Sequence, residues 1–131
     1  MKTLHINSHK QVEMIDITGD VRTAIHEENV TDGLAVVFTP HTTAAITINE
    51  NADPDVCRDM VMEIDRIVPL LDDYLHREGN SAAHIKSSLF GAGETLIISN
   101  AEIVLGTWQG IYFCEFDGPR QRQVHIQAIG R

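Results

Sequence analysis

The chain is poor in cysteine, in basic residues and in long apolar runs, and each shortage excludes a class of protein. Two cysteines in 131 residues are too few for a disulfide scaffold, and they are not spaced as a C-x-x-C pair. Ten Lys and Arg against nineteen Asp and Glu give a net charge of −9. Nucleic-acid modules and peripheral membrane proteins need positive surface, so neither is expected. A small local phosphate site is still compatible with this charge.

Targeting and membrane segments are also missing. The first residues show no charged segment followed by an apolar stretch, so no signal peptide is expected, and no apolar run approaches a membrane span. Apolar residues make up 43% and charged residues 22%, which excludes an intrinsically disordered chain. Linkers and internal repeats are absent. We therefore expect one soluble, cytoplasmic domain over residues 1–131, with both thiols free.

The apolar pattern predicts mostly strands. Runs rich in β-branched residues and bounded by turn residues predict strands over 2–7, 12–17, 34–39, 42–49, 95–99, 103–106, 110–117 and 122–129. Helices are expected from Thr18 or Asp20 to about Asn29, from Pro54 until Pro69 ends the helix, and over about 82–89. The last four strands, joined by short connections, predict an antiparallel meander. The class is α+β, a mostly antiparallel sheet with two or three inserted helices.

Three polar segments interrupt this pattern. They comprise residues 40–43 with 49–53, residues 76–86, and residues 106–109 with 114–120. Together they supply carboxylates, imidazoles, a thiol, amides and cations, which is the inventory of an active site.

Three of these residues have both a structural and a chemical interpretation. Asp53 can cap the helix that starts at Pro54, or orient a catalytic histidine, and a carboxylate can do both. His84 lies in the first turn of a helix, whose dipole suits a neutral base or metal ligand; a solvated histidine is the alternative. Cys114 alternates with Tyr112 and Phe116 on an apolar strand, which favours a buried, inert thiol. A nucleophilic Cys114 would require a nearby imidazole or cation.

Other residues offer anion and metal contacts. Asn80 and Ser81 precede a helix and provide free backbone N–H groups, which Lys86 and Arg120 can supplement with positive charge. Both cations can equally be solvated. Trp108, the only tryptophan, either packs in a core or stacks on a flat ring.

The candidate metal ligands are imidazoles. His41, His76 and His84 could share an ion, although their spacing matches no recognised ligand motif. Surface histidine is the alternative for His76.

Four longer motifs resemble the YjbQ family (UPF0047), also known as secondary thiamine-phosphate synthases. They are PHTTA at 40–44, NENADP at 49–54, EGNSAAHIKSSL at 78–89 and LGTWQGIYFCEFDGPR at 105–120. The resemblance covers essentially the whole chain. It implies a compact α+β fold, a homotrimer with pockets near subunit contacts, and a catalytic trio of Asp53, His84 and Cys114.

The implied reaction joins a pyrimidine diphosphate to a thiazole phosphate with release of pyrophosphate, as a side activity. Mg²⁺ or another divalent metal would support the leaving diphosphate. Lys86, Arg120 and the helix start would hold phosphate, and Trp108 or Tyr112 would flank a ring. The full set expected to bind this small phosphorylated metabolite is His41, Asn49, Glu50, Asn51, Glu78, Asn80, Ser81, Lys86, Trp108, Gln109 and Arg120.

Two other functions fit the same residues. One is a thiol- or metal-assisted hydrolase or transferase, with Cys114 as nucleophile and His84 as base. The other is a non-enzymatic protein that binds small anions.

Overall fold

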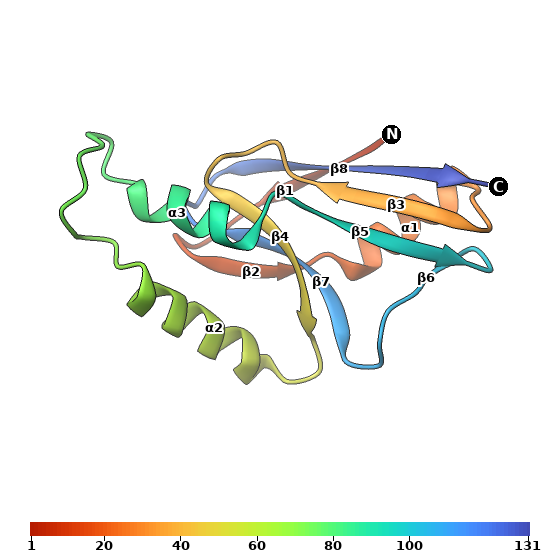
Figure 1. Cartoon of the computed structure of the whole chain (residues 1–131), viewed down its shortest axis with the longest axis horizontal. Coiled ribbons are helices and arrows are strands. Elements are labelled where there is room, and N and C mark those ends of the chain that lie inside the picture. The colour runs from red at the N-terminus through yellow and green to blue at the C-terminus, as the bar shows by residue number, and fades with distance from the viewer.

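The computed structural model describes all 131 residues as one α+β domain (Figure 1). Its eight strands and three helices follow one another as β1 (Lys2–Asn7), β2 (Glu13–Asp16), α1 (Thr18–Glu28), β3 (Gly33–Phe38), β4 (Ala44–Glu50), α2 (Pro54–Ile67), α3 (Ser81–Phe90), β5 (Gly93–Ser99), β6 (Glu102–Ile103), β7 (Gln109–Glu115) and β8 (Gln121–Gly130). These bounds lie close to the predicted ones, except that β6 has only two residues.

The strands form two antiparallel sheets. The large sheet has the order β1-β8-β3-β5-β6, and the small sheet has the order β2-β7-β4. The predicted meander of the last four strands is therefore wrong. After β6 the chain leaves the large sheet, forms the centre of the small sheet as β7, and returns as β8 between β1 and β3. This early departure also explains why β6 is so short.

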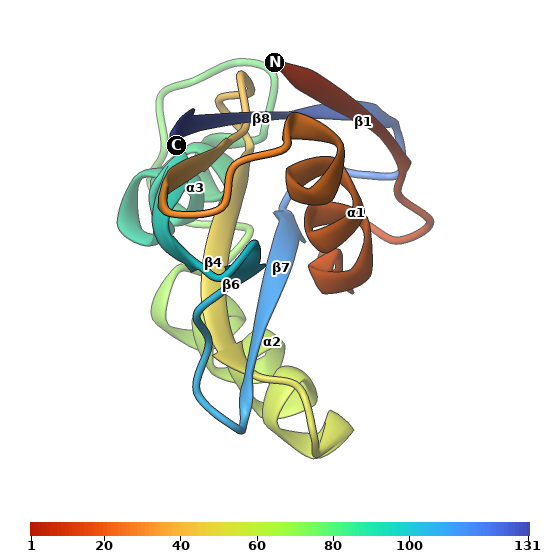
Figure 2. The same cartoon turned by 90° about the vertical axis from the view of Figure 1, so that its right-hand side faces the viewer.

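The main core lies between the two sheets and α1. Figure 2 shows α1 beneath the large sheet and beside β7. Their inward side chains form one buried cluster that includes Val21, Val37, Ile46, Phe113 and Ile126. No helix covers the outer face of the large sheet (Figures 1 and 2).

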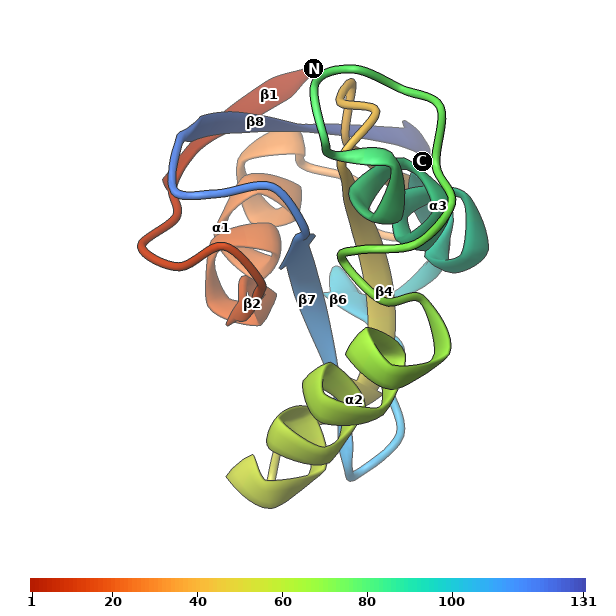
Figure 3. The same ribbon diagram turned by 90° about the vertical axis from the view of Figure 1, so that its left-hand side faces the viewer.

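A second, smaller cluster covers the other face of the small sheet. It contains Ala45, Ala83, Tyr112, Cys114 and Phe116, contributed by β4, α3 and the β7 segment. Figure 3 shows α3 against β4, with α2 below it. Because the small sheet is covered on both faces, β7 is buried from residue 110 to its end, which explains its continuous apolar run.

Helix α2 begins as the sequence predicts. Asp53 is the N-cap and its Oδ1 accepts the Asp55 N–H at 2.9 Å, with Pro54 in the first turn. None of the residues of α2 is fully buried, although the helix carries an apolar stripe. Neither α2 nor any other helix has the length and apolarity needed to cross a membrane.

Candidate functional site

A cavity lined mainly by polar side chains, here called the polar pocket, lies where three distant parts of the chain meet. These are the β3–β4 connection, the segment leading into α3, and the turn between β7 and β8. The cavity has a volume of about 430 Å³ and no hydrophobic residue lines it. Its walls are Pro40, His41, Thr42, Thr43, His76, Glu78, Asn80, His84, Asp117, Arg120 and Arg122.

A buried ion pair supports this pocket. The guanidinium of Arg122 donates from Nε to Glu115 Oε1 at 2.9 Å and from Nη2 to Glu115 Oε2 at 2.5 Å. Glu115 is 0% exposed and also accepts from Ser8 Oγ at 2.6 Å and from the Asp117 N–H at 3.1 Å. Arg122 donates further to Thr43 Oγ1 at 2.8 Å. Such a set of hydrogen bonds is what a buried charge pair needs to be tolerated.

The charged state of the pair follows from these contacts. Burial by itself would raise the pKa of Glu115, but hydrogen bonds from Arg122, Ser8 and Asp117 together with the Arg122 charge hold that pKa below its ordinary value. The second amino group of Arg122, Nη1, makes no hydrogen bond to the protein and is not among the buried unpaired atoms. Arg122 lines both the polar pocket and a second cavity beside His5 and Asn7, so Nη1 is free to donate to a ligand in one of these two cavities.

Arg120 is oriented in a similar way by Asp117. Its Nε donates to the Asp117 carbonyl at 2.9 Å and its Nη2 to Asp117 Oδ2 at 3.0 Å. The Asn80 amide donates to the same carboxylate oxygen at 2.9 Å. Asn80 Oδ1 is buried and has no hydrogen-bond partner within the chain. Two of the five guanidinium N–H groups of Arg120 are used, which leaves the others for a ligand.

His41 is held as a neutral hydrogen-bond donor. The Gln123 N–H donates to His41 Nε2 at 2.9 Å, so the neutral ring carries its proton on Nδ1. Burial and then the Arg122 charge lower the pKa of His41, and the Glu115 charge offsets part of this effect. The imidazole is therefore neutral at pH 7.

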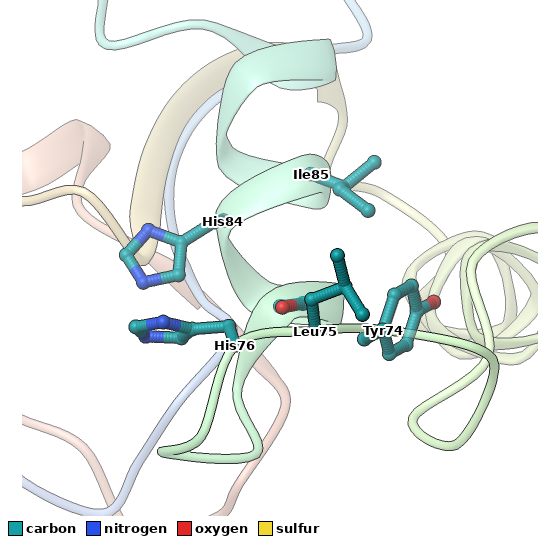
Figure 4. A pocket seen from close by; sticks show the side chains of 6 residues that line it. Tyr74, Leu75, His76, His84 and Ile85 are labelled. Atoms are coloured by element: carbon teal, nitrogen blue, oxygen red, sulfur yellow. The ribbon is translucent and has the colours of Figure 1, made fainter.

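The other two imidazoles of the pocket lie side by side. The rings of His76 and His84 meet edge to face with their centroids 5.6 Å apart (Figure 4). No group of three or more His, Cys, Asp or Glu is arranged to hold a metal ion. The expected set of His41, His76 and His84 thus lines one cavity without forming a ligand set.

Known proteins resemble this chain in sequence and in fold. The family model for UPF0047 protein YjbQ-like matches residues 2–131. The chain belongs to the YjbQ family. The UPF0047 protein YugU of Bacillus subtilis is 53% identical over 131 residues, which is 99% of each chain. The UPF0047 protein MJ1081 of Methanocaldococcus jannaschii is 51% identical over 125 residues, which is 95% of this chain and 91% of that one.

Solved structures of YjbQ-like proteins share the whole fold. An uncharacterised YjbQ/UPF0047 protein from Clostridium acetobutylicum superimposes with a TM-score of 0.97 at 53% identity, covering 98% of this chain and 100% of that one. A hypothetical protein from Aeropyrum pernix gives a TM-score of 0.95 at 31% identity, covering 99% and 98%. The α+β class expected from the sequence is thereby confirmed.

Several residues from the YjbQ motifs lie outside the polar pocket. Lys86, expected to hold phosphate, is 3% exposed and forms an ion pair with Asp65 of α2. Its Nζ also lies 6.0 Å from the centre of the Phe116 ring. Lys86 therefore ties α3 to α2, and it lines a neighbouring cavity that shares Asn80 and Asp117 with the polar pocket. Ser81 lines a neighbouring cavity with His84.

A second group of expected residues gathers at the opposite end of the small sheet, around the end of β4 and the start of β7. Glu50 pairs with Gln109, and the Asn51 N–H donates to the Trp108 carbonyl at 2.9 Å. The pocket residue Thr43 precedes the other end of β4, about 20 Å away at the rise of a strand. Within one chain, the two groups of expected residues therefore lie at opposite ends of the small sheet. The group far from the polar pocket comprises Asn49, Glu50, Asn51, Asp53, Trp108 and Gln109.

Cys114 is sealed in the interior. It is 0% exposed, packs in the smaller cluster with Ala45 and Tyr112, and lies on β7 opposite Met14 of β2 and Ala45 of β4. Burial raises the pKa of its thiol to about 12, with a smaller contribution from Cys57. The expected trio of Asp53, His84 and Cys114 is not assembled within one chain, and the geometry agrees with the interpretation of an inert thiol.

The ion pair of Glu115 and Arg122 was not among the site residues expected from the sequence, although the sequence pattern contains an indication of it. Alternation along the last strand places Arg122 on the same face as Val124 and Ile126. The same reasoning places Glu115 with Phe113 on the inward face of its strand. Opposite charges at two inward positions indicate a buried pair, but only the sheet pairing brings them together.

Proposed function

We propose that the polar pocket binds the phosphate or diphosphate group of a small metabolite. The observation that carries this proposal is that each main donor is already held by its own partner. Glu115 orients Arg122, Asp117 orients Arg120, and the Gln123 N–H selects the donor form of His41. Donors fixed before the ligand arrives stabilise its negative charge without reorganisation. Because Asp117 and Glu115 pair with the two arginines and Glu78 also lines the pocket, the preference for anions rests on the guanidinium N–H groups that remain free and not on a net positive charge.

The reaction that suits such a pocket is departure of pyrophosphate from a carbon centre, as in a thiamine-phosphate synthase side activity. The bond between the pyrimidine methylene carbon and the diphosphate oxygen breaks, and its electron pair leaves with pyrophosphate. The thiazole nitrogen then forms a new bond to the methylene carbon. Arg120, Arg122 and His41 would stabilise the charge that develops on the leaving group, and His84 would donate a proton to the departing diphosphate oxygen.

Neither a thiol nor a protein-held metal has a step in this scheme. Cys114 is sealed from the pocket, so the alternative of a Cys114 nucleophile has no geometric support. No group of three or more His, Cys, Asp or Glu is arranged to hold an ion by itself, so Mg²⁺ or another divalent metal would enter bound to the diphosphate, with Glu78 or Asp117 of the pocket as its protein contact.

Replacing Arg120 by alanine should weaken pyrophosphate binding and slow the synthase reaction, each by about 10- to 100-fold, because a preorganised charged donor is lost. Isothermal titration with inorganic pyrophosphate measures the first effect. Pyrophosphate release from the pyrimidine diphosphate and the thiazole phosphate measures the second. Arg58→Ala is the matched control, since Arg58 is exposed on α2, forms no ion pair and lies outside the pocket.

The outcomes separate the candidate functions. Binding that depends on Arg120 without any turnover would make the protein a non-enzymatic binder of small anions. No binding of pyrophosphate to the wild-type protein, or equal binding by both variants, would contradict the pocket assignment altogether.

We also propose that the chain acts as a cytoplasmic homotrimer with its site near a subunit contact. Three features support assembly: the apolar stripe of α2 without a buried residue, the division of the motif residues between two ends of the small sheet, and an exposed apolar face on the large sheet. That face presents Leu34, Val36, Phe38, Ile97 and Ile129. Such a patch on a small protein marks an interaction surface. Both thiols are free, as a reducing compartment requires.

Light scattering after size-exclusion chromatography should give three times the mass of the chain. Val36→Lys should shift the mass to one chain, because it places a charge in the centre of the exposed apolar face. Thr23→Lys on the outer side of α1 should leave the trimer intact. A wild-type monomer at micromolar concentration would contradict the assembly.

A further inference from the structure

A second cavity, here called the apolar groove, opens beside the polar pocket. It also has a volume of about 430 Å³. Figure 4 shows the side chains of Tyr74, Leu75 and Ile85 on one side and the rings of His76 and His84 on the other. Both histidines line the polar pocket as well, so the two cavities share a wall. The full lining is Tyr74, Leu75, His76, Ser81, His84 and Ile85.

The apolar side chains of the groove have no role in the core. Leu75 is 96% exposed and Ile85 is 40% exposed, and neither belongs to a buried cluster. Tyr74 is anchored because its hydroxyl donates to the Pro69 carbonyl at 2.6 Å, so its ring keeps a fixed position at the mouth. An aromatic ring held by one hydrogen bond and two exposed aliphatic side chains therefore line a cavity that shares His76 and His84 with the polar pocket.

We propose that the apolar groove is the subsite for a flat apolar group, an aromatic ring, carried by the phosphorylated ligand of the polar pocket. This inference rests on the proposed function. A ligand with its phosphate near Arg120 reaches the groove by passing His76 and His84, whose rings meet edge to face and present apolar surface to a flat group. The occupant is thus a phosphate ester of an aromatic alcohol, anionic at one end and apolar at the other.

The sequence predicts that Trp108 or Tyr112 contacts a ring of the ligand, but the positions of these two residues do not fit that role within one chain. Tyr112 is buried, and its hydroxyl donates to the Glu50 carbonyl at 2.9 Å. Trp108 lies at the opposite end of the small sheet. Within one chain neither can flank a ring whose phosphate is in the polar pocket, whereas Tyr74 and Leu75 can.

The test compares two esters that differ only in the apolar group. Wild-type protein should bind phenyl phosphate about tenfold more tightly than methyl phosphate in isothermal titration, because the phenyl ring buries additional apolar surface. The double variant Leu75→Ser, Ile85→Ser should lose this preference and keep its affinity for methyl phosphate. The control is Leu71→Ser, Leu89→Ser, which replaces exposed leucines of the same loop and helix outside the groove. That control should keep the tenfold preference.

Each result has a distinct meaning. Equal affinities for both esters in the wild-type protein, or equal weakening of both by the groove variant, would overturn the subsite alone. Binding of neither ester would overturn the proposed function and the subsite with it. A groove variant that breaks the assembly while keeping the phenyl preference would also overturn the subsite, since a second copy of the chain would then cover the groove.

Discussion

Glu115→Gln should lower the free energy of unfolding by about 3–5 kcal/mol, because it leaves the buried charge of Arg122 without its partner. Glu115 is 0% exposed and Arg122 is 4% exposed, so water can reach the guanidinium only from its Nη1 side and cannot replace the contacts that Nε and Nη2 make with Glu115. The amide can accept from Ser8 or from one guanidinium nitrogen, but it carries no charge. Urea unfolding followed by circular dichroism measures the change.

An exposed ion pair provides the control. Glu102 contacts Arg22 and His26 on the surface, and Glu102→Gln should cost less than about 1 kcal/mol. Adding Arg122→Met to Glu115→Gln should recover part of the lost stability, since no buried charge is then left alone. A Glu115→Gln protein as stable as the wild type would show that the pair is not buried in solution.

The same carboxylate makes stability depend on pH. The folded pKa of Glu115 is below its ordinary value, so the group contributes stability that is fully present above that ordinary value, about 4.3. This contribution is lost as the pH falls through the folded pKa. Wild-type protein should therefore lose stability below that ordinary value more steeply than Glu115→Gln.

Thiol labelling of the native protein at pH 8 should modify Cys57 at least 100-fold faster than Cys114. Cys114 is sealed and its pKa is raised to about 12, so about one thiol in ten thousand is ionised at that pH. Cys57 lies partly exposed on α2. Mass spectrometry of the peptides after labelling with iodoacetamide measures both rates.

Two controls for the labelling of Cys114 are labelling of the unfolded protein and the substitution Cys114→Ser. In urea both cysteines should react at similar rates, because the burial that protects Cys114 is gone. Cys114→Ser should leave the synthase rate unchanged within about twofold, since the thiol has no assigned step. Rapid modification of Cys114 in the native state would restore it as a nucleophile and contradict its burial.

Local sequence patterns predicted most helices and strands of this fold, but they did not predict which distant strands pair. Alternation identified β8, and the Asp53-Pro54 pair marked the start of α2. The prediction of a meander was wrong because β7 is apolar on both faces. A continuous apolar run does not indicate to which sheet the strand belongs. Strand partners are chosen by the burial of whole faces, and no short window of sequence contains that information.

By itself the sequence determined the α+β class, the capped start of α2 at Asp53, and several of the polar residues that line the pocket, among them His41, His84 and Arg120, whereas the side-chain caps expected for α1 and α3 are absent. It could do so because periodicity and capping are local, and because polar residues are costly within apolar runs. Only the tertiary structure decided which of them act together. In the folded chain Lys86 pairs with Asp65, and Cys114 is buried between α3 and the small sheet. Trp108 lies at the far end of the small sheet, about 20 Å from the pocket at the rise of a strand. The net charge of −9 gave no hint of the two oriented arginines, because their positions depend on carboxylates brought beside them only by folding.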